Sequence, residues 1–148
     1  MIDLNEILDM WSEDCRINNN KLDESSSQSP VLHAKYLRLL SEAKLMLKKV
    51  ERDQKVLLKD KWLYYNGKMD QKQLDSKGWN PDPFDGLKVM KGEMEHYYNS
   101  DPEIQRSEEK VEYWKTIIST LQEIVDNVKW RHQTIGNIIR WKQFEAGM

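Results

Sequence analysis

Cations and aromatic rings are interleaved in the segment LLKDKWLYYNGK, residues 57–68. Ammonium groups can neutralise phosphates, and flat rings can stack on unpaired bases, a contact that contributes roughly 1–3 kcal/mol per base. The segment therefore has the side chains needed to hold a polyanion with exposed bases, such as single-stranded nucleic acid. These side chains belong to Lys59, Lys61, Trp62, Tyr64, Tyr65 and Lys68.

The same segment also suits the end of an ordinary amphipathic helix, in which the rings continue the apolar face from Leu58. For Trp62 and Tyr65 we slightly favour this core interpretation. For Lys59 and Lys61, which flank Asp60 and are not expected in a core, we favour contact with a ligand. The pattern is suggestive, but it is not a specific motif.

A row of cations precedes this segment at helical spacing. Its five members follow one another at intervals of four, four, three and four residues, which places them along one side of a helix. A charge run is more often a solvated face, but Glu51 and Asp53 are the only acids between its first and last members, and the row leads into the aromatic segment. We call this row the basic stripe; it consists of Lys44, Lys48, Arg52, Lys55 and Lys59.

The charge of the chain is segregated. Residues 31–68 hold ten basic and four acidic residues, a net charge of +6, whereas the whole chain carries −2 and the remainder therefore −8. A basic field of this kind binds phosphates by releasing counterions, without reading the sequence of bases. If several copies of the chain associate, their fields add.

Helices are predicted to position these residues. A short acidic helix is expected over 2–16 with Asp3 as its N-cap, followed by a polar linker over 18–29. Ser29–Pro30 is expected to open a long helix, because serine suits the N-cap and proline the first helical position. This helix runs to Tyr65, since residues 31–65 lack glycine and proline, and Asn66–Gly67 ends it.

The second half of the chain is predicted to contain another long helix. Residues 66–83 hold many turn formers and are expected to form a loop, and 84–99 is a weak helix candidate because it contains two glycines. Ser100 or Asp101 caps a helix over 102–144. We therefore expect an all-α fold with an N-terminal region, 1–29, and a nucleic-acid-binding and oligomerisation domain, 30–148, divided into 30–65, 66–100 and 101–145.

The last helix carries heptads. Eight of nine core slots are apolar, and Ile117, Ile124 and Ile138 widen the apolar face, which indicates two neighbouring helices. We expect those neighbours to be other copies of the chain, assembled as a helical ring or barrel. His132 fills one slot and is expected to be a core or polar-layer residue. The predicted oligomerisation residues are Val111, Trp114, Ile118, Leu121, Val125, Val128, His132, Ile135, Ile139 and, near the end, Phe144.

Residues for catalysis or cofactor binding are not grouped in the sequence. The three histidines are far apart, and no glycine-rich phosphate loop is present. Cys15 is the only cysteine, which excludes an intrachain disulfide and suits a reducing cytosol. No apolar run is long enough to span a bilayer. We expect no enzyme, no metal, no cofactor and no membrane partner.

In several of these stretches the chain resembles the UvsY family of recombination mediators from T-even-type bacteriophages. The matching stretches are KVLLKDKWLYYNGK (55–68), MKGEM (90–94), VEYW (111–114) and the terminal RWKQFEAGM. Their order and spacing agree over roughly residues 30–148, and the first thirty residues match less closely. Each match is weak alone, and the last, with Phe144–Gly147, is the most distinctive.

The resemblance implies a hexameric or heptameric protein that binds single-stranded DNA in the cytoplasm of the infected bacterial host. It implies two protein partners, the phage UvsX recombinase and the phage single-strand binding protein, and no nucleotide. It places DNA binding at a basic pair that matches Lys59 and Lys61, and assembly on the C-terminal helix. Asp60 and the second lysine depart from the family's pattern, which implies a weaker or more salt-sensitive contact.

Two rival interpretations remain open. The long helices and acidic ends also suit a coiled-coil structural adaptor that binds only proteins. A small helical enzyme would need a clustered polar site, which the sequence does not display.

Overall fold

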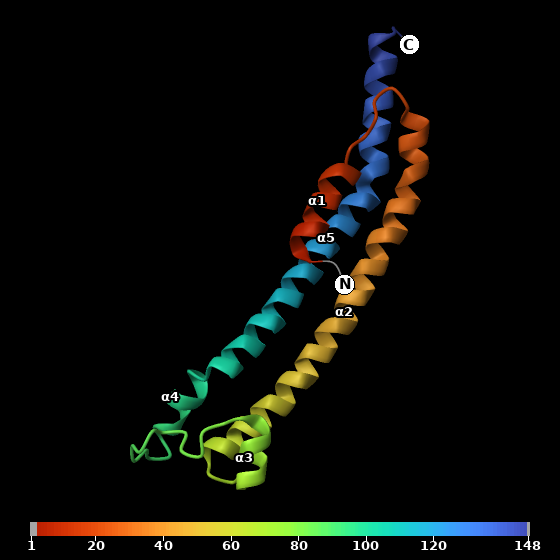
Figure 1. Ribbon diagram of the computed structural model, residues 1–148. Helices are drawn as coiled ribbons and strands as arrows, with labels where there is room; N and C mark the ends of the chain where they lie inside the picture. The colour runs from red at the N-terminus through yellow and green to blue at the C-terminus, as the bar shows by residue number, and fades with distance from the viewer. Residues whose placement is uncertain (1–2, 148) are drawn as a thin grey trace. The chain divides into compact units, whose positions relative to one another are not determined.

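The computed structural model describes residues 3–147, and within that range every regular element is an α-helix. The all-α prediction is therefore confirmed. The chain divides into a terminal unit, up to Leu45 and from Trp114 onward, and a central unit, Met46–Tyr113. The helices are α1 (Leu4–Asp14), α2 (Leu22–Tyr65), α3 (Gln71–Lys77), α4 (Met94–Asn99) and α5 (Pro102–Glu145), as labelled in Figure 1.

The first helix begins where its capping residues predict. The Asp3 side chain accepts a hydrogen bond from the Glu6 N–H at 2.8 Å, and the Glu6 carboxylate accepts one from the Asp3 N–H at 3.3 Å. This reciprocal pair satisfies two of the free N–H groups at the start of α1. The helix ends at Asp14, and the residue that caps its end is Cys15, whose thiol is exposed. Residue 2, where we expected the helix to begin, lies outside the described residues.

The second helix begins earlier than predicted, so the expected linker over 18–29 is wrong from residue 22 onward. Pro30 lies inside α2 and does not begin it. A proline inside a helix removes one hydrogen bond and crowds the preceding turn. Here that turn is held from outside, because the Ser25 carbonyl accepts a hydrogen bond from Arg131 on α5 at 3.4 Å, and the Ser25 hydroxyl accepts one from the Asn18 N–H at 3.1 Å.

The core of the terminal unit joins α1, α2 and α5. We expected the heptad residues to pack against other copies of the chain. This expectation is wrong for much of their apolar face, which packs within one chain. Leu121, Val125 and Val128 are buried with Ile7 of α1 and Tyr36 of α2, and Trp114 and Ile118 pack against the same cluster. The sequence predicted two neighbouring helices, and in this unit they are α1 and α2. Ile135 is also buried in this unit, and Val111 is buried in the central unit.

His132 does not occupy the core slot predicted for it. Its ring is exposed, and the neighbouring Arg131 is buried instead. The Arg131 guanidinium donates hydrogen bonds to the backbone carbonyls of Asp14, Arg16 and Ser25, at 3.4–3.5 Å. On a straight helix with 3.6 residues per turn, positions 131 and 132 lie on either side of the line from Val128 to Ile135, and here position 131 is the buried one.

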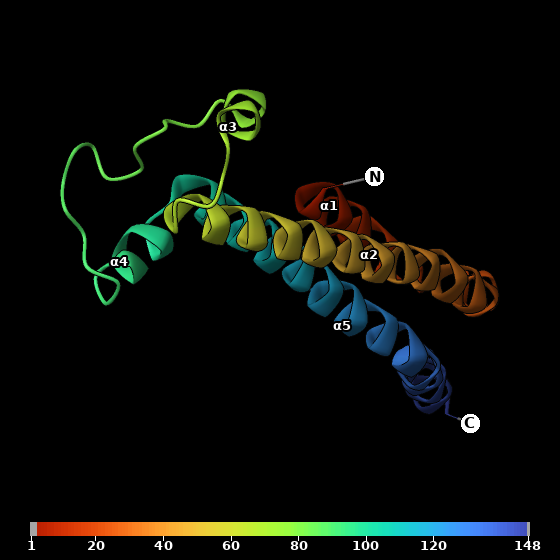
Figure 2. The ribbon, with the colours of Figure 1, turned by 90° about the horizontal axis from the view of Figure 1, so that it is seen from below.

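The core of the central unit consists mainly of aromatic side chains. Tyr64 and Tyr65 at the end of α2 are buried with Leu74 of α3. Figure 1 shows α3 and α4 near the end of α2 and the start of α5, and Figure 2 shows the long loop that connects α3 to α4. The rings that pack against this cluster are Trp79, Phe84, Tyr97 and Tyr98.

We expected residues 66–83 to form a loop, but part of this segment is the helix α3. Asp70 caps α3, because its side chain accepts a hydrogen bond from the Gln73 N–H at 2.8 Å and the Gln73 side-chain oxygen accepts one from the Asp70 N–H. Gly78 ends the helix with a φ of 68°. The helix candidate over 84–99 is reduced to the six residues of α4. Asp101, one of the two expected caps of α5, accepts from the N–H groups of Glu103 and Ile104.

Candidate nucleic-acid interface

The basic stripe lies on the solvent side of α2. All five of its cations are exposed. Within residues 3–147, Lys59 makes one weak ion pair, with Asp60 at 3.8 Å, and the other four make none. Asp60 is held by Lys77 at 3.2 Å, so it neutralises the stripe only in part. The stripe is therefore a row of cations available to an external anion.

Lys61 is buried, so the expectation that it lies outside the core is wrong. Its ammonium lies 3.0 Å from the Asp101 carboxylate and 3.4 Å from that of Glu103, and only 5% of its side chain is exposed. Residues two positions apart on a helix point in nearly opposite directions. Lys59 and Lys61 therefore cannot share a face, and Lys61 points to the interior of the central unit.

The surroundings of Lys61 form a buried polar network. The ammonium lies 4.0 Å from the ring centroid of Trp79, whose indole N–H donates to Glu103 at 2.8 Å. The Tyr65 hydroxyl donates to Asp101 at 2.7 Å. Each buried charge thus has an opposite charge and a hydrogen bond, which burial of charge requires. The network ties the end of α2 to the start of α5 and to the segment after α3.

The network shifts the protonation of its members. Burial acts to raise the pKa of Asp101, but the hydrogen bonds from Tyr65, Lys61 and the Ile104 N–H outweigh it and hold that pKa below its ordinary value. Burial, with the Asp101 carboxylate beside it, raises the pKa of Tyr65. Asp101 is therefore ionised, and Tyr65 is the neutral donor, at any pH near neutral.

The three aromatic residues of the predicted contact segment have different surroundings. Tyr65 is buried, as the core interpretation predicted, and so is Tyr64, whose hydroxyl donates to the Asn80 carbonyl at 2.6 Å. Trp62 is 50% exposed, so the core interpretation is wrong for this residue. It follows Lys59 by three positions and shares its face of α2. The ammonium of Lys68 lies 4.6 Å from its ring centroid.

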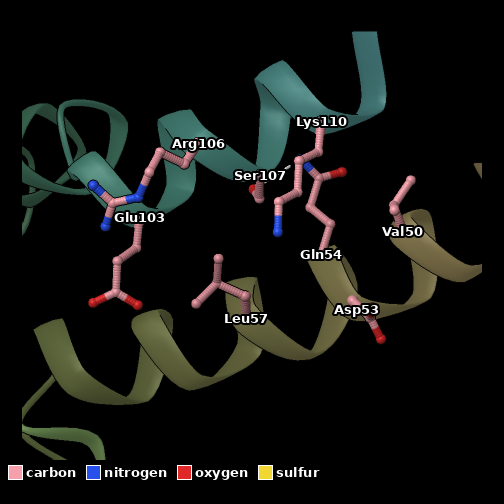
Figure 3. Close-up of a pocket in the computed structure, with 8 residues that line it drawn as sticks. All are labelled: Val50, Asp53, Gln54, Leu57, Glu103, Arg106, Ser107 and Lys110. Carbon is pink, nitrogen blue, oxygen red and sulfur yellow. Dashed lines mark hydrogen bonds between the residues drawn. The ribbon is translucent and has the colours of Figure 1, made fainter. Parts of the chain in front are cut away.

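Another face of α2 in the central unit borders a pocket of about 390 Å³. Figure 3 shows Val50, Gln54 and Leu57 of α2 opposite Arg106 and Lys110 of α5, with a hydrogen bond from Gln54 to Ser107, which measures 3.3 Å. Asp53 and Glu103 also line the pocket, so its charges have both signs. This mixture makes the pocket a poor cradle for phosphate, and we do not include it in the interface.

The described residues, 3–147, contain no group of three or more His, Cys, Asp or Glu side chains placed to hold a metal ion. In the same range no helix has the length and apolar character needed to cross a membrane.

The residues that sequence reasoning missed are those of the buried network. Asp101, Glu103 and Trp79 are far from Lys61 in the sequence, and only the tertiary fold brings them together. The burial of Lys61 itself had a signal, since it lies four residues after Leu57 and three before Tyr64, on the apolar side of the helix.

Three comparisons relate the chain to known proteins. A family model described as "Recombination, repair and ssDNA binding protein UvsY" matches residues 10–148. The recombination protein uvsY of Enterobacteria phage T4 is 25% identical over 144 residues, which cover 97% of this chain and 98% of that protein.

Solved structures of the bacteriophage T4 recombination mediator protein UvsY have a similar fold. One crystal form gives a TM-score of 0.79 at 23% identity and covers 99% of both chains. A second gives 0.78 at 22% identity and covers 97% of this chain and 99% of the other.

Proposed function

The chain belongs to the UvsY family of recombination, repair and single-stranded-DNA-binding proteins, and from that premise we propose that it binds DNA through the exposed face of α2. The proposal is carried by one observation, a row of exposed and nearly unpaired cations that leads to the half-exposed ring of Trp62. Phosphates of a single strand would contact the basic stripe and Lys68, and bases would stack on Trp62.

The contact set differs from the one expected from the sequence. Lys59 and Trp62 are surface contacts, whereas Lys61, Tyr64 and Tyr65 support that surface from inside the central unit. A substitution of Lys61 would then weaken DNA binding by disturbing the position of α2, and not by removal of a phosphate contact.

The biological role that we propose is that of a recombination mediator without a catalytic step of its own. It would act in the cytoplasm of an infected bacterium and help to load the phage UvsX recombinase onto strands coated by the phage single-strand binding protein. The protein-only adaptor is not favoured, because single-stranded DNA binding is part of the family's description.

Self-association of six or seven subunits would place several basic stripes on one strand, so that weak contacts combine into strong binding. The far end of α5 offers a surface for it. Ile139, Trp141 and Phe144 are 41%, 60% and 72% exposed, and such a group of large apolar side chains is typical of a binding surface.

The experiment compares a variant that loses charge from the basic stripe with a control variant that loses the same charge elsewhere. The Lys55→Ala/Lys59→Ala variant loses two stripe cations, and the Lys21→Ala/Lys72→Ala variant loses two exposed lysines outside the stripe. We expect the slope of log K against log salt for oligo-dT to become shallower by about 1.4 in the first variant, because each phosphate contact contributes about 0.7. The control should keep the slope of the unsubstituted protein. Equal slopes in the two variants would contradict the stripe as the DNA-binding surface.

A further inference from the structure

A pocket of about 440 Å³ lies in the central unit between the end of α2 and α4. It has the size of a small-molecule site, for which volumes of about 300–1,000 Å³ are usual. Three aromatic rings line it, those of Trp62, Tyr65 and Tyr98. Trp62 is also the last member of the exposed face of α2, so the pocket and the proposed DNA surface share one side chain.

The aromatic walls present apolar surface to the pocket. The Tyr65 hydroxyl donates to Asp101 at 2.7 Å, and the Tyr98 hydroxyl donates to the Leu58 carbonyl at 3.4 Å. Because both hydroxyls are engaged elsewhere, what the two rings offer to a ligand is their carbon surface. The buried network around Lys61 holds Tyr65 in this position before any ligand arrives.

Polar groups on the same pocket have unused hydrogen-bonding capacity. The Asn66 side-chain amide donates to the Trp62 carbonyl at 2.7 Å, which leaves the amide oxygen as an acceptor. Lys91 and Glu95 are exposed and make no ion pair within residues 3–147. The pocket therefore combines flat apolar walls with a donor and two acceptors at its edge.

This combination fits a nucleobase, which has flat faces for stacking and an edge of donors and acceptors. A phosphate alone would not use the rings, and an aliphatic ligand would leave the three polar groups unpaired. Lys59, one turn before Trp62, and Lys68, at the Trp62 ring, supply positive charge for the backbone on either side of such a base.

We propose that this pocket receives one unpaired base of the bound strand, between the end of α2 and α4. The proposal rests on the proposed function, because the strand must first lie along α2. It assigns a role to the segment between the two long helices, whose α4 supplies one wall. It also gives a reason for a preference for single strands, since a base stacked inside a duplex cannot enter.

The first test needs no variant. Affinities are measured for two strands of equal length and charge, oligo-dT and an oligomer of abasic deoxyribose phosphates. We expect dT to bind about tenfold more tightly, the order of one aromatic–base stack. Equal affinity for the two strands, with salt-dependent binding retained, would overturn the pocket but leave the proposed function in place. No binding of either strand would overturn the proposed function itself.

Two variants then separate the pocket from simple surface stacking. The Trp62→Ala variant should lose most of the dT-to-abasic ratio, whereas Trp130→Ala, which removes an exposed ring in the terminal unit, should keep it. The Glu95→Tyr variant fills the pocket from α4 without changing Trp62, and it should also reduce the ratio. Because the ratio compares strands of equal charge, the effect of the lost carboxylate on the phosphate backbone cancels, and only contacts with the base change the ratio. An unchanged ratio in Glu95→Tyr would overturn the pocket.

Discussion

Lys61 lies between two carboxylates and above an indole ring, whereas Lys59 projects into solvent two positions earlier. The two lysines carry the same charge and lie only two positions apart, yet their substitution is expected to change different free energies. On the proposed interface, the exposed lysine is expected to change the free energy of DNA binding, whereas the buried, paired lysine is expected to change the free energy of unfolding. Measurements on either residue are informative only when both quantities are determined.

We predict that Lys61→Met destabilises the protein strongly. The substitution leaves the Asp101 carboxylate buried without its cation, and breaking a buried pair in this way costs about 3–5 kcal/mol. Lys59→Ala should change the free energy of unfolding by less than about 0.5 kcal/mol, because the side chain is exposed. Urea unfolding followed by far-UV circular dichroism measures both.

A second substitution checks the mechanism of this loss. The Lys61→Met/Asp101→Asn variant removes both charges, so it should recover part of the stability lost in Lys61→Met. A double variant as unstable as the sum of its two single variants would contradict a direct ion pair.

The low pKa of Asp101 predicts how stability depends on pH. A carboxyl whose pKa is lower in the folded state than in the unfolded chain stabilises the fold above the unfolded value, about 3.9, and loses this contribution as the pH falls through the folded value. We expect the free energy of unfolding to decrease below about pH 4. Asp101→Asn should be less stable at pH 7 but lose less on acidification, and urea titrations at pH 7 and at about pH 3 compare them. Parallel pH profiles would contradict this assignment.

At the scale of the element, the ends of α1, α2 and α3 show where local sequence rules succeed and fail. The Asp3 cap of α1 and the end of α2 at Tyr65 were predictable, because each depends on residues within one turn. The start of α2 was not, because the turns before Pro30 are held at the Ser25 carbonyl by Arg131, more than a hundred positions away. The start of α3 had a usable local signal, the Asp70–Gln73 capping box, which the turn-rich composition around it obscured.

We predict that Pro30→Ala stabilises the protein. Proline in a helix interior costs about 3 kcal/mol relative to alanine, and loss of its restriction on the unfolded chain offsets about 1 kcal/mol, so a gain of about 2 kcal/mol is expected. Ser27→Ala, an exposed change in the same part of α2, serves as the control and should change stability by less than about 0.5 kcal/mol. Thermal unfolding gives both values, and a destabilised Pro30→Ala would show that the proline ring itself has a packing role.

At the scale of the whole molecule, the heptads of α5 could have packed within the chain or against other copies, and a single sequence pattern cannot separate the two. An apolar residue covered by a neighbouring helix looks the same in sequence whether that helix belongs to the same chain or to another. Leu121 and Val125 are covered by α1 and α2 of their own chain, whereas Ile139 and Phe144 remain exposed. The fold class was therefore predictable, and the partner of each heptad residue was not.

This division predicts different outcomes along one helix. Ile139→Ser/Phe144→Ser should lower the molar mass measured by light scattering and leave the helical content unchanged, because both side chains are exposed in the single chain. Leu121→Ala should instead reduce the stability of the subunit by about 2–5 kcal/mol, since this side chain is fully buried. An unchanged molar mass in the double serine variant would contradict assembly through the end of α5.

The cysteine that caps the end of α1 has a practical consequence for the subunit number. Its thiol is exposed, and it is the only one in the chain, so a maleimide dye would attach at one position per molecule. On a single immobilised assembly, the number of stepwise photobleaching events would then equal the number of copies present. The unaltered protein can therefore be counted one particle at a time, both free and on a strand.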